Sequence, residues 1–205
     1  TKHQRRMSIG VSQSERESMS NQIHVHQGIP QIPFDLFVKK TRNCIIFTDA
    51  YDNPVYLGKS HHHSSESSLS PRHPSRALFD SSGNPIIFIF RDNLGSWKAF
   101  KEDGRSEELL FRVEQTLNTS TKIEFNIVLV REDGEDIALT MRGCPYWRSC
   151  TIYQDKTIVA QTNLMHKFGL KKIFSRRNKS IVTFFPGFSN YNLIAALVLI
   201  FLDGR

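Results

Sequence analysis

The sequence has few cysteines and none of the short motifs that common enzyme classes carry. Cys44, Cys144 and Cys150 are too few and too unevenly spaced for a disulfide framework or a zinc site, so we expect reduced, packed thiols. There is no nucleophile elbow, no phosphate-binding glycine loop and no His-Glu-x-x-His motif. These absences argue against hydrolases, nucleotide-binding enzymes and metalloproteases. We therefore expect a protein that is not an enzyme and that uses no cofactor and no metal.

The sequence also lacks a long apolar run. The run Leu193–Leu202 is shorter than the roughly 20 residues that cross a bilayer, and residues 1–7 do not form the apolar stretch of a secretory signal. The mean hydropathy of −0.36 is that of a water-soluble protein. We expect an intracellular, cytoplasmic monomer without a transmembrane segment, with peripheral membrane or nuclear association as further options.

Two segments contain few large apolar side chains. Residues 1–28 are rich in Ser, Gln, Arg and His, and residues 59–75 are rich in Ser and His. Such segments bury too little apolar surface to offset the entropy of ordering. We therefore predict a disordered tail over 1–28 and a single domain over 29–205, with a mobile loop at 59–75. Three adjacent histidines in this loop, 61–63, are interpreted as loop residues and not as a metal site.

Short runs of β-branched and aromatic residues recur along the rest of the chain, separated by turn sequences such as Ser82-Gly-Asn-Pro and Asp133-Gly. Strands separated by such short turns are typical of antiparallel hairpins. In the strand over 122–131, apolar residues occupy both faces at one end, including Val128 and Val130, which predicts a strand end that is covered on both sides. The twelve predicted strands are 34–40, 44–48, 54–57, 77–80, 86–91, 97–100, 109–116, 122–131, 136–141, 148–154, 157–163 and 180–185.

The chain ends in one predicted helix that has no polar face. Ser189 or Asn190 can cap its first turn, and Gly204 follows it where a helix stop is favoured. A helix that is apolar on every side must be shielded from water on every side. Because this one is too short to span a membrane, the strands have to surround it. The sequence therefore predicts a mainly β fold, a twelve-stranded antiparallel closed barrel around a buried hydrophobic C-terminal α-helix.

Five parts of the sequence are informative together, namely Phe47–Tyr56, Leu78–Ile87, Trp97, Ile158–Gln161 and Phe185–Asp203. They resemble the plant LURP-one-related family, in the tubby-like C-terminal domain superfamily, which is related to the phospholipid scramblases. The similarity runs in consistent order from Ile32 to Arg205. It implies a barrel around a buried helix, no catalytic activity, and a link to plant defence signalling. Tubby domains bind phosphoinositide head groups, so the resemblance also implies a binding or signalling module at a lipid surface.

The strongest charge feature is a cluster of basic residues close to the C-terminus. No Asp or Glu occurs between Lys156 and Leu202, and six basic residues fall within a short stretch of that segment. Such a cluster attracts phosphate, so we predict binding of anionic phospholipid head groups. An ordinary solvated connection between two strands is the alternative reading of the same residues. The predicted lipid- or phosphate-binding residues are Lys167, Lys171, Lys172, Arg176, Arg177 and Lys179.

The formal net charge of +7 and the pI of about 9.5 also suit partners other than lipid. Basic proteins attract nucleic acids and acidic proteins as well as anionic membranes, and charge alone does not choose among these. The resemblance to tubby-type proteins implies a membrane-tethered regulator, and the net charge would tolerate DNA. The alternative function is therefore that of a membrane-tethered transcription-linked or nucleic-acid-binding regulator.

Overall fold

Twelve strands precede a single helix in the computed structural model, which describes residues 32–60, 75–92, 94–101, 108–131, 133–165 and 179–203. This order confirms the predicted sequence of elements. The elements are β1 (Phe34–Lys40), β2 (Cys44–Thr48), β3 (Pro54–Ser60), β4 (Arg76–Phe79), β5 (Pro85–Arg91), β6 (Trp97–Lys101), β7 (Glu108–Asn118), β8 (Ile123–Leu129), β9 (Ile137–Cys144), β10 (Ser149–Gln154), β11 (Thr157–Leu164), β12 (Lys179–Phe184) and α1 (Tyr191–Asp203).

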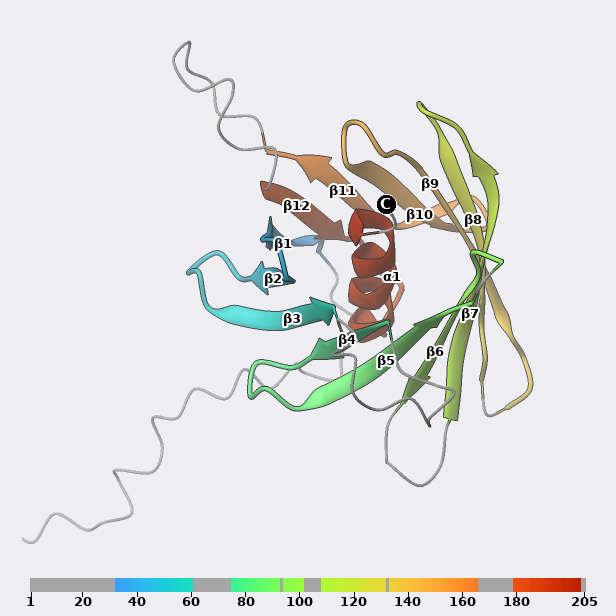
Figure 1. The fold of residues 1–205 in the computed structure, drawn as a ribbon, viewed down its shortest axis with the longest axis horizontal. Helices are drawn as coiled ribbons and strands as arrows, with labels where there is room; N and C mark the ends of the chain where they lie inside the picture. The colour runs from blue at the N-terminus through green and yellow to red at the C-terminus, as the bar shows by residue number, and fades with distance from the viewer. Residues whose placement is uncertain are drawn as a thin grey trace, which may run out of the picture.

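The strands form one closed antiparallel barrel. Each strand pairs with the next along the chain, and β1 closes the sheet by pairing with β12, with Phe34 opposite Phe184 and Lys39 opposite Lys179. Closure means that none of the twelve described strands lies at an open edge of the sheet. Figure 1 shows the strands arranged around α1, with the C-terminus at one end of the helix. The predicted fold class is confirmed.

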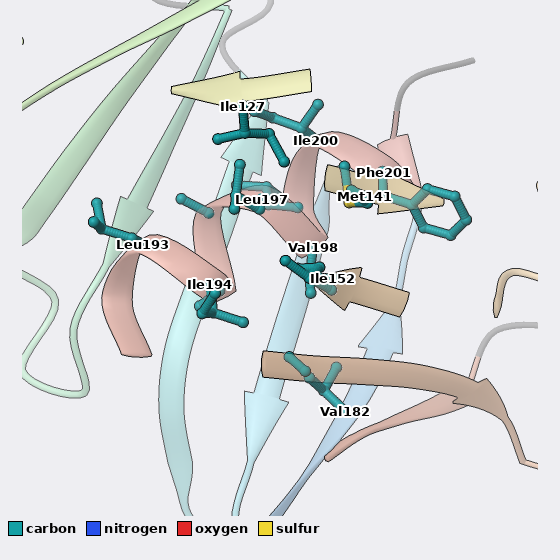
Figure 2. Packing of buried hydrophobic residues seen from close by; sticks show 14 of the residues in the cluster. Ile127, Met141, Ile152, Val182, Leu193, Ile194, Leu197, Val198, Ile200 and Phe201 are labelled. Atoms are coloured by element: carbon teal, nitrogen blue, oxygen red, sulfur yellow. The ribbon is translucent and has the colours of Figure 1, made fainter. Parts of the chain in front are cut away.

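Helix α1 fills the interior of the barrel. Every residue from Ile194 to Ile200 is at most 1% exposed, so all sides of the helix are covered, as its apolar sequence requires. Alternate strand residues point inward to meet it, because successive side chains of a strand face opposite sides of the sheet. Figure 2 shows such residues from β8, β9, β10 and β12 around the helix, namely Ile127, Met141, Ile152 and Val182.

Two strand glycines let the helix come close to the sheet. A Cβ atom at Gly58 would lie 2.5 Å from Cδ1 of Leu199, and one at Gly143 would lie 2.5 Å from the Ser149 carbonyl oxygen and 2.8 Å from the Phe201 ring. A side chain at either position would occupy space that α1 or its neighbours already fill. The two glycines are therefore part of the packing of the helix.

Because consecutive strands are antiparallel, the connections alternate between the two ends of the barrel. Helix α1 begins at the end that holds the β2–β3 and β4–β5 turns and finishes at the end that holds the β1–β2 and β9–β10 turns. There the Lys40 Nζ atom donates a hydrogen bond to the Leu202 carbonyl oxygen over 2.7 Å. A cation at a helix C-terminus complements the negative end of the helix dipole.

The structure corrects several predicted strand ends. Strand β3 continues to Ser60, so Lys59 and Ser60, which the sequence placed in the loop over 59–75, belong to the sheet. Lys59 pairs with Ala77 and Ser60 with Arg76, and the ladder to β4 accounts for the longer strand. The rest of that loop up to residue 74, its three histidines and the tail over 1–28 lie outside the described residues.

The exposure of Val128 contradicts the predicted covering of both faces at one end of the strand over 122–131. Val128 is 37% exposed, whereas Ile127 and Leu129 on either side of it are buried. Buried and exposed side chains therefore alternate along β8 up to this end of the strand. The outer face there is exposed, although its valines predicted that it would be covered.

Candidate functional site

The two ends of the barrel carry opposite charge. We call the end where α1 finishes the basic rim, meaning its turns and the two adjoining residues of each strand. Among the described residues, basic side chains there greatly outnumber acidic ones. The basic residues are Lys39, Lys40, Arg42, Lys59, Arg76, Arg91, Lys98, Lys122, Arg148 and Lys179, and the acidic ones are Asp92, Glu124 and Asp203.

The opposite end, defined in the same way and called the acidic rim, has the reverse composition in the described part of the chain. Some of its carboxylates shape turns. The Asp49 Oδ1 atom accepts hydrogen bonds from the backbone N–H groups of Tyr51 and Asn53, and bonding to Asn53 lowers the pKa of Asp49. The acidic residues are Asp35, Asp49, Asp52, Asp80, Glu108, Asp133, Glu135, Asp136 and Asp155, and the basic ones are Lys101, Arg131 and Lys156.

Lys179 is the one predicted site residue that the structure describes. It begins β12 and stands directly opposite Lys39 of β1 across the ladder. Both side chains are on the outward face, since the inward positions next to them are Val38 and Ser180. Like charges placed directly opposite each other on a sheet are destabilising. An anion between the two ammonium groups would relieve this repulsion.

The other five predicted residues, Lys167, Lys171, Lys172, Arg176 and Arg177, lie outside the described residues. Their segment joins two residues of known position, Met165 after β11 and Lys179 at the start of β12, and the Met165 backbone N–H donates to the Lys179 carbonyl oxygen over 3.1 Å. The two described residues that flank the sequence cluster, Met165 and Lys179, therefore both lie at the basic rim.

An open groove of about 660 Å³ lies on the outer face near the basic rim, over the ends of β7 to β11. A row of polar residues crosses it from strand to strand, with Glu124 opposite Arg142, Arg142 opposite Thr151, and Thr151 opposite Gln161. The Arg142 Nε atom donates to Glu124 Oε2 over 2.8 Å, so this carboxylate offsets one of the cations of the groove. Lys122 supplies a second cation to the lining.

Cys150 belongs to the groove lining, but its side chain lies on the inward face of β10 and is part of the barrel core. Cys150 is buried, and burial raises the pKa of its thiol to about 12, although a hydrogen bond with Thr162 opposes the shift. The thiol is therefore neutral near pH 7, whereas a nucleophilic cysteine needs a lowered pKa. Cys144 lines the groove at intermediate burial, and all three cysteines are free.

Sequence reasoning missed the groove residues. Lys122, Arg142, Gln161 and Asn163 are scattered polar residues in the sequence and meet only through the strand register. The alternation of inward and outward positions along the strands indicates that these side chains face outward. This is the one sequence signal for the groove. Within the described ranges, no group of three or more His, Cys, Asp and Glu side chains could hold a metal ion, and no helix combines the length and apolarity needed to cross a membrane.

Comparison with known proteins identifies the family. The LURP-one-related family model matches residues 34–203. Protein LURP-one-related 7 of Arabidopsis thaliana is 34% identical over 184 residues, covering 87% of this chain and 93% of that protein. Protein LURP-one-related 15 of the same plant is 27% identical over 139 residues, covering 64% and 62% of the two chains.

A solved structure agrees with the fold. An Arabidopsis thaliana protein with an X-ray structure is 26% identical and superposes with a TM-score of 0.56 over 86% of this chain and 93% of its own. The match of the family model over nearly the whole barrel, together with these relatives, shows that the chain belongs to the LURP-one-related family.

Proposed function

We propose that this chain is a non-enzymatic binding and signalling module that associates with phosphoinositide or other anionic membrane lipid through its basic rim. The observation that carries the proposal is the separation of charge between the two ends of one barrel. The proposal places the protein in the cytoplasm, where it meets anionic leaflets. The part of it that concerns plant defence is supported by the family resemblance alone.

The architecture favours binding on the outside of the barrel. Helix α1 occupies the interior, so a partner meets the outer wall or a rim. Near an anionic leaflet each basic residue contributes about 1 kcal/mol, and several at one end add up to peripheral attachment. A strand of seven residues is about 23 Å long at roughly 3.3 Å per residue, which exceeds the Debye length of about 8 Å in physiological salt. With the basic rim on the membrane, the carboxylates of the acidic rim are screened from it.

Sedimentation with vesicles tests the proposal. The full chain is mixed with vesicles of phosphatidylcholine alone, of phosphatidylcholine with phosphatidylserine, and of phosphatidylcholine with a phosphorylated phosphatidylinositol. We expect binding to the two anionic compositions, strongest with the phosphoinositide, and weaker binding as salt increases. Equal failure to bind neutral and anionic vesicles would overturn the proposal.

Matched charge reversals locate the binding surface. The variant Lys39→Glu/Lys179→Glu changes the basic rim, and Lys101→Glu/Lys156→Glu makes the same change of net charge at the acidic rim. A third variant reverses Lys171, Lys172, Arg176 and Arg177 to Glu and tests the sequence cluster. We expect large losses of binding in the first and third variants and little loss in the second. Tighter binding to a short DNA duplex than to anionic vesicles would favour the nucleic-acid alternative.

A further inference from the structure

The tip of the β9–β10 hairpin exposes two adjacent aromatic side chains. The turn spans residues 145–148, and the Arg148 backbone N–H donates to the Pro145 carbonyl oxygen over 3.3 Å. Tyr146 is 57% exposed and Trp147 is 55% exposed, and their rings meet edge to face at 5.0 Å and 89°. Both rings are thus more than half exposed at the basic rim.

Packing in the core of the barrel does not account for the aromatic side chains of Tyr146 and Trp147. The chain's other tryptophan, Trp97, is 2% exposed and packs against Phe125 with ring centroids 5.6 Å apart. The hairpin tip also holds a residue other than glycine in the left-handed region, since Arg148 has a φ of 50°. Such a conformation costs roughly 1 kcal/mol or more. The fold therefore keeps an exposed aromatic pair on a turn of unfavourable backbone geometry.

The surroundings of the tip indicate what it contacts. Cys144 and Ser149, which flank the turn in sequence, line the polar groove, and Lys122 and Arg142 lie in the same lining. Tryptophan and tyrosine favour the depth of the lipid head groups, where an apolar ring and a polar N–H or O–H group are both accommodated. Basic residues beside such rings favour an anionic leaflet.

We propose that the Tyr146–Trp147 tip is an interfacial anchor that inserts into the head-group region of an anionic membrane when the basic rim binds it. This inference rests on the proposed lipid association and adds the part of the protein that enters the bilayer. In this arrangement the lysines and arginines of the rim contact phosphate groups. The rings of Tyr146 and Trp147 bury their apolar surface deeper in the membrane than these phosphate groups.

An exposed aromatic residue at the other end provides a matched control. Tyr51, in the β2–β3 turn, is 86% exposed, but it lies between Asp49 and Asp52 at the acidic rim. Anionic lipid would repel this turn, although its ring is more accessible than either ring of the tip. Charge and exposure together, and not exposure alone, distinguish the β9–β10 tip.

Fluorescence quenching tests the anchor directly. The full chain is mixed with vesicles of phosphatidylcholine and phosphatidylserine whose acyl chains are brominated, and quenching is compared with that by unbrominated vesicles. We expect a blue shift and quenching for the native chain and the loss of both in Trp147→Phe, where only buried Trp97 remains. Tyr146→Ser/Trp147→Ser should weaken vesicle binding about tenfold, or about 1.4 kcal/mol, and Tyr51→Ser should change it less than about twofold.

The outcomes separate this inference from the proposed function. If the native chain binds anionic vesicles without quenching of Trp147, and the double serine variant binds as tightly, the anchor is overturned while lipid association stands, and the tip becomes a contact for a protein partner. If the native chain does not bind, both proposals fall. Because both rings are more than half exposed, the thermal unfolding midpoints of the serine variants should match that of the native chain, which excludes misfolding as the cause of weaker binding.

Discussion

The interior and the rims of this barrel differ in what their side chains do. Inside, helix α1 and the inward residues of the strands form one continuous apolar core in which residues such as Ala195 and Val198 have no exposed surface. At the rims, charged side chains are separated by sign and most contact water. Stability therefore depends on the interior and the proposed lipid binding on the rims, so either property can be changed while the other is kept.

The largest expected effect is a loss of stability from a substitution inside the barrel. Leu197 lies in the middle of α1 and is fully buried. Leu197→Ala leaves a cavity in contact with the sheet and should cost about 2–5 kcal/mol of unfolding free energy. Urea denaturation monitored by far-UV circular dichroism measures this cost. The matched rim substitution is Leu94→Ala, at a side chain that is 93% exposed, for which we expect a change within about 0.5 kcal/mol. Similar losses for both leucines would contradict the division between interior and rims.

A smaller loss is expected when a methyl group is added at the closest approach of helix and sheet. At Gly143 the new Cβ atom would meet a backbone oxygen, which cannot rotate away, as well as Cys150 and Phe201. Gly143→Ala should therefore cost about 1–3 kcal/mol. At Gly58 only the flexible end of Leu199 blocks the methyl group, so Gly58→Ala should cost less. Thermal unfolding of the two variants shows which substitution costs more stability. A larger loss for Gly58→Ala than for Gly143→Ala would contradict the packing described at these two glycines.

Alkaline pH should weaken the interior of the barrel. Burial raises the pKa of Cys150 to about 12 from 9.0 and that of Tyr56 to about 12 from 10.0. In the unfolded chain these groups lose their protons at lower pH than in the native state, so the native state binds more protons between about pH 9 and 12 and its stability falls as pH rises through that window. Urea midpoints at pH 7, 9 and 10 should fall in that order. Cys150→Ala should flatten the decline, and an unchanged slope would rule out the thiol as a contributor.

The smallest expected effect lies where the interior meets the basic rim. Lys40 donates to the last turn of α1, whereas its neighbour Lys39 points outward toward Lys179. Lys40→Met removes a charged hydrogen bond and a favourable dipole interaction and should cost about 1 kcal/mol. Lys39→Met relieves repulsion and should leave the unfolding free energy unchanged or slightly higher. Equal destabilisation by the two substitutions, measured by urea denaturation, would contradict the assigned orientations.

The fold could be predicted because its main constraints are local. The run Leu193–Leu202 has no polar face, and the turn sequences between apolar strands are short, so a closed sheet around the helix follows from the sequence and the family resemblance. Strand ends were less predictable. Lys59 and Ser60 look like the start of a polar loop, and only pairing with β4 holds them in the sheet. Val128 looked like a core residue because valine is common in buried strands, yet alternation places it outside.

The candidate site could be predicted only where its residues are contiguous. The cluster over 167–179 is visible as a charge run, but Lys39 and Lys179 are far apart in the sequence and become neighbours through closure of the barrel. The polar groove depends in the same way on the registers of four strands. Trp147 could not be separated from Trp97 by sequence, because both residues adjoin strands and only the packing shows which one is buried.

The orientation of the protein on a vesicle shows whether the basic rim is the surface that faces the lipid. A nitroxide label is attached at Leu94→Cys on the basic rim or at Tyr51→Cys on the acidic rim, each in a chain where Cys44 and Cys144 are replaced by serine. Accessibility to a water-soluble relaxation agent is then measured with and without anionic vesicles. We expect vesicles to protect the label at residue 94 and to leave the label at residue 51 accessible. Equal protection of both labels, or protection of residue 51 alone, would contradict the assignment of the basic rim as the membrane-binding surface.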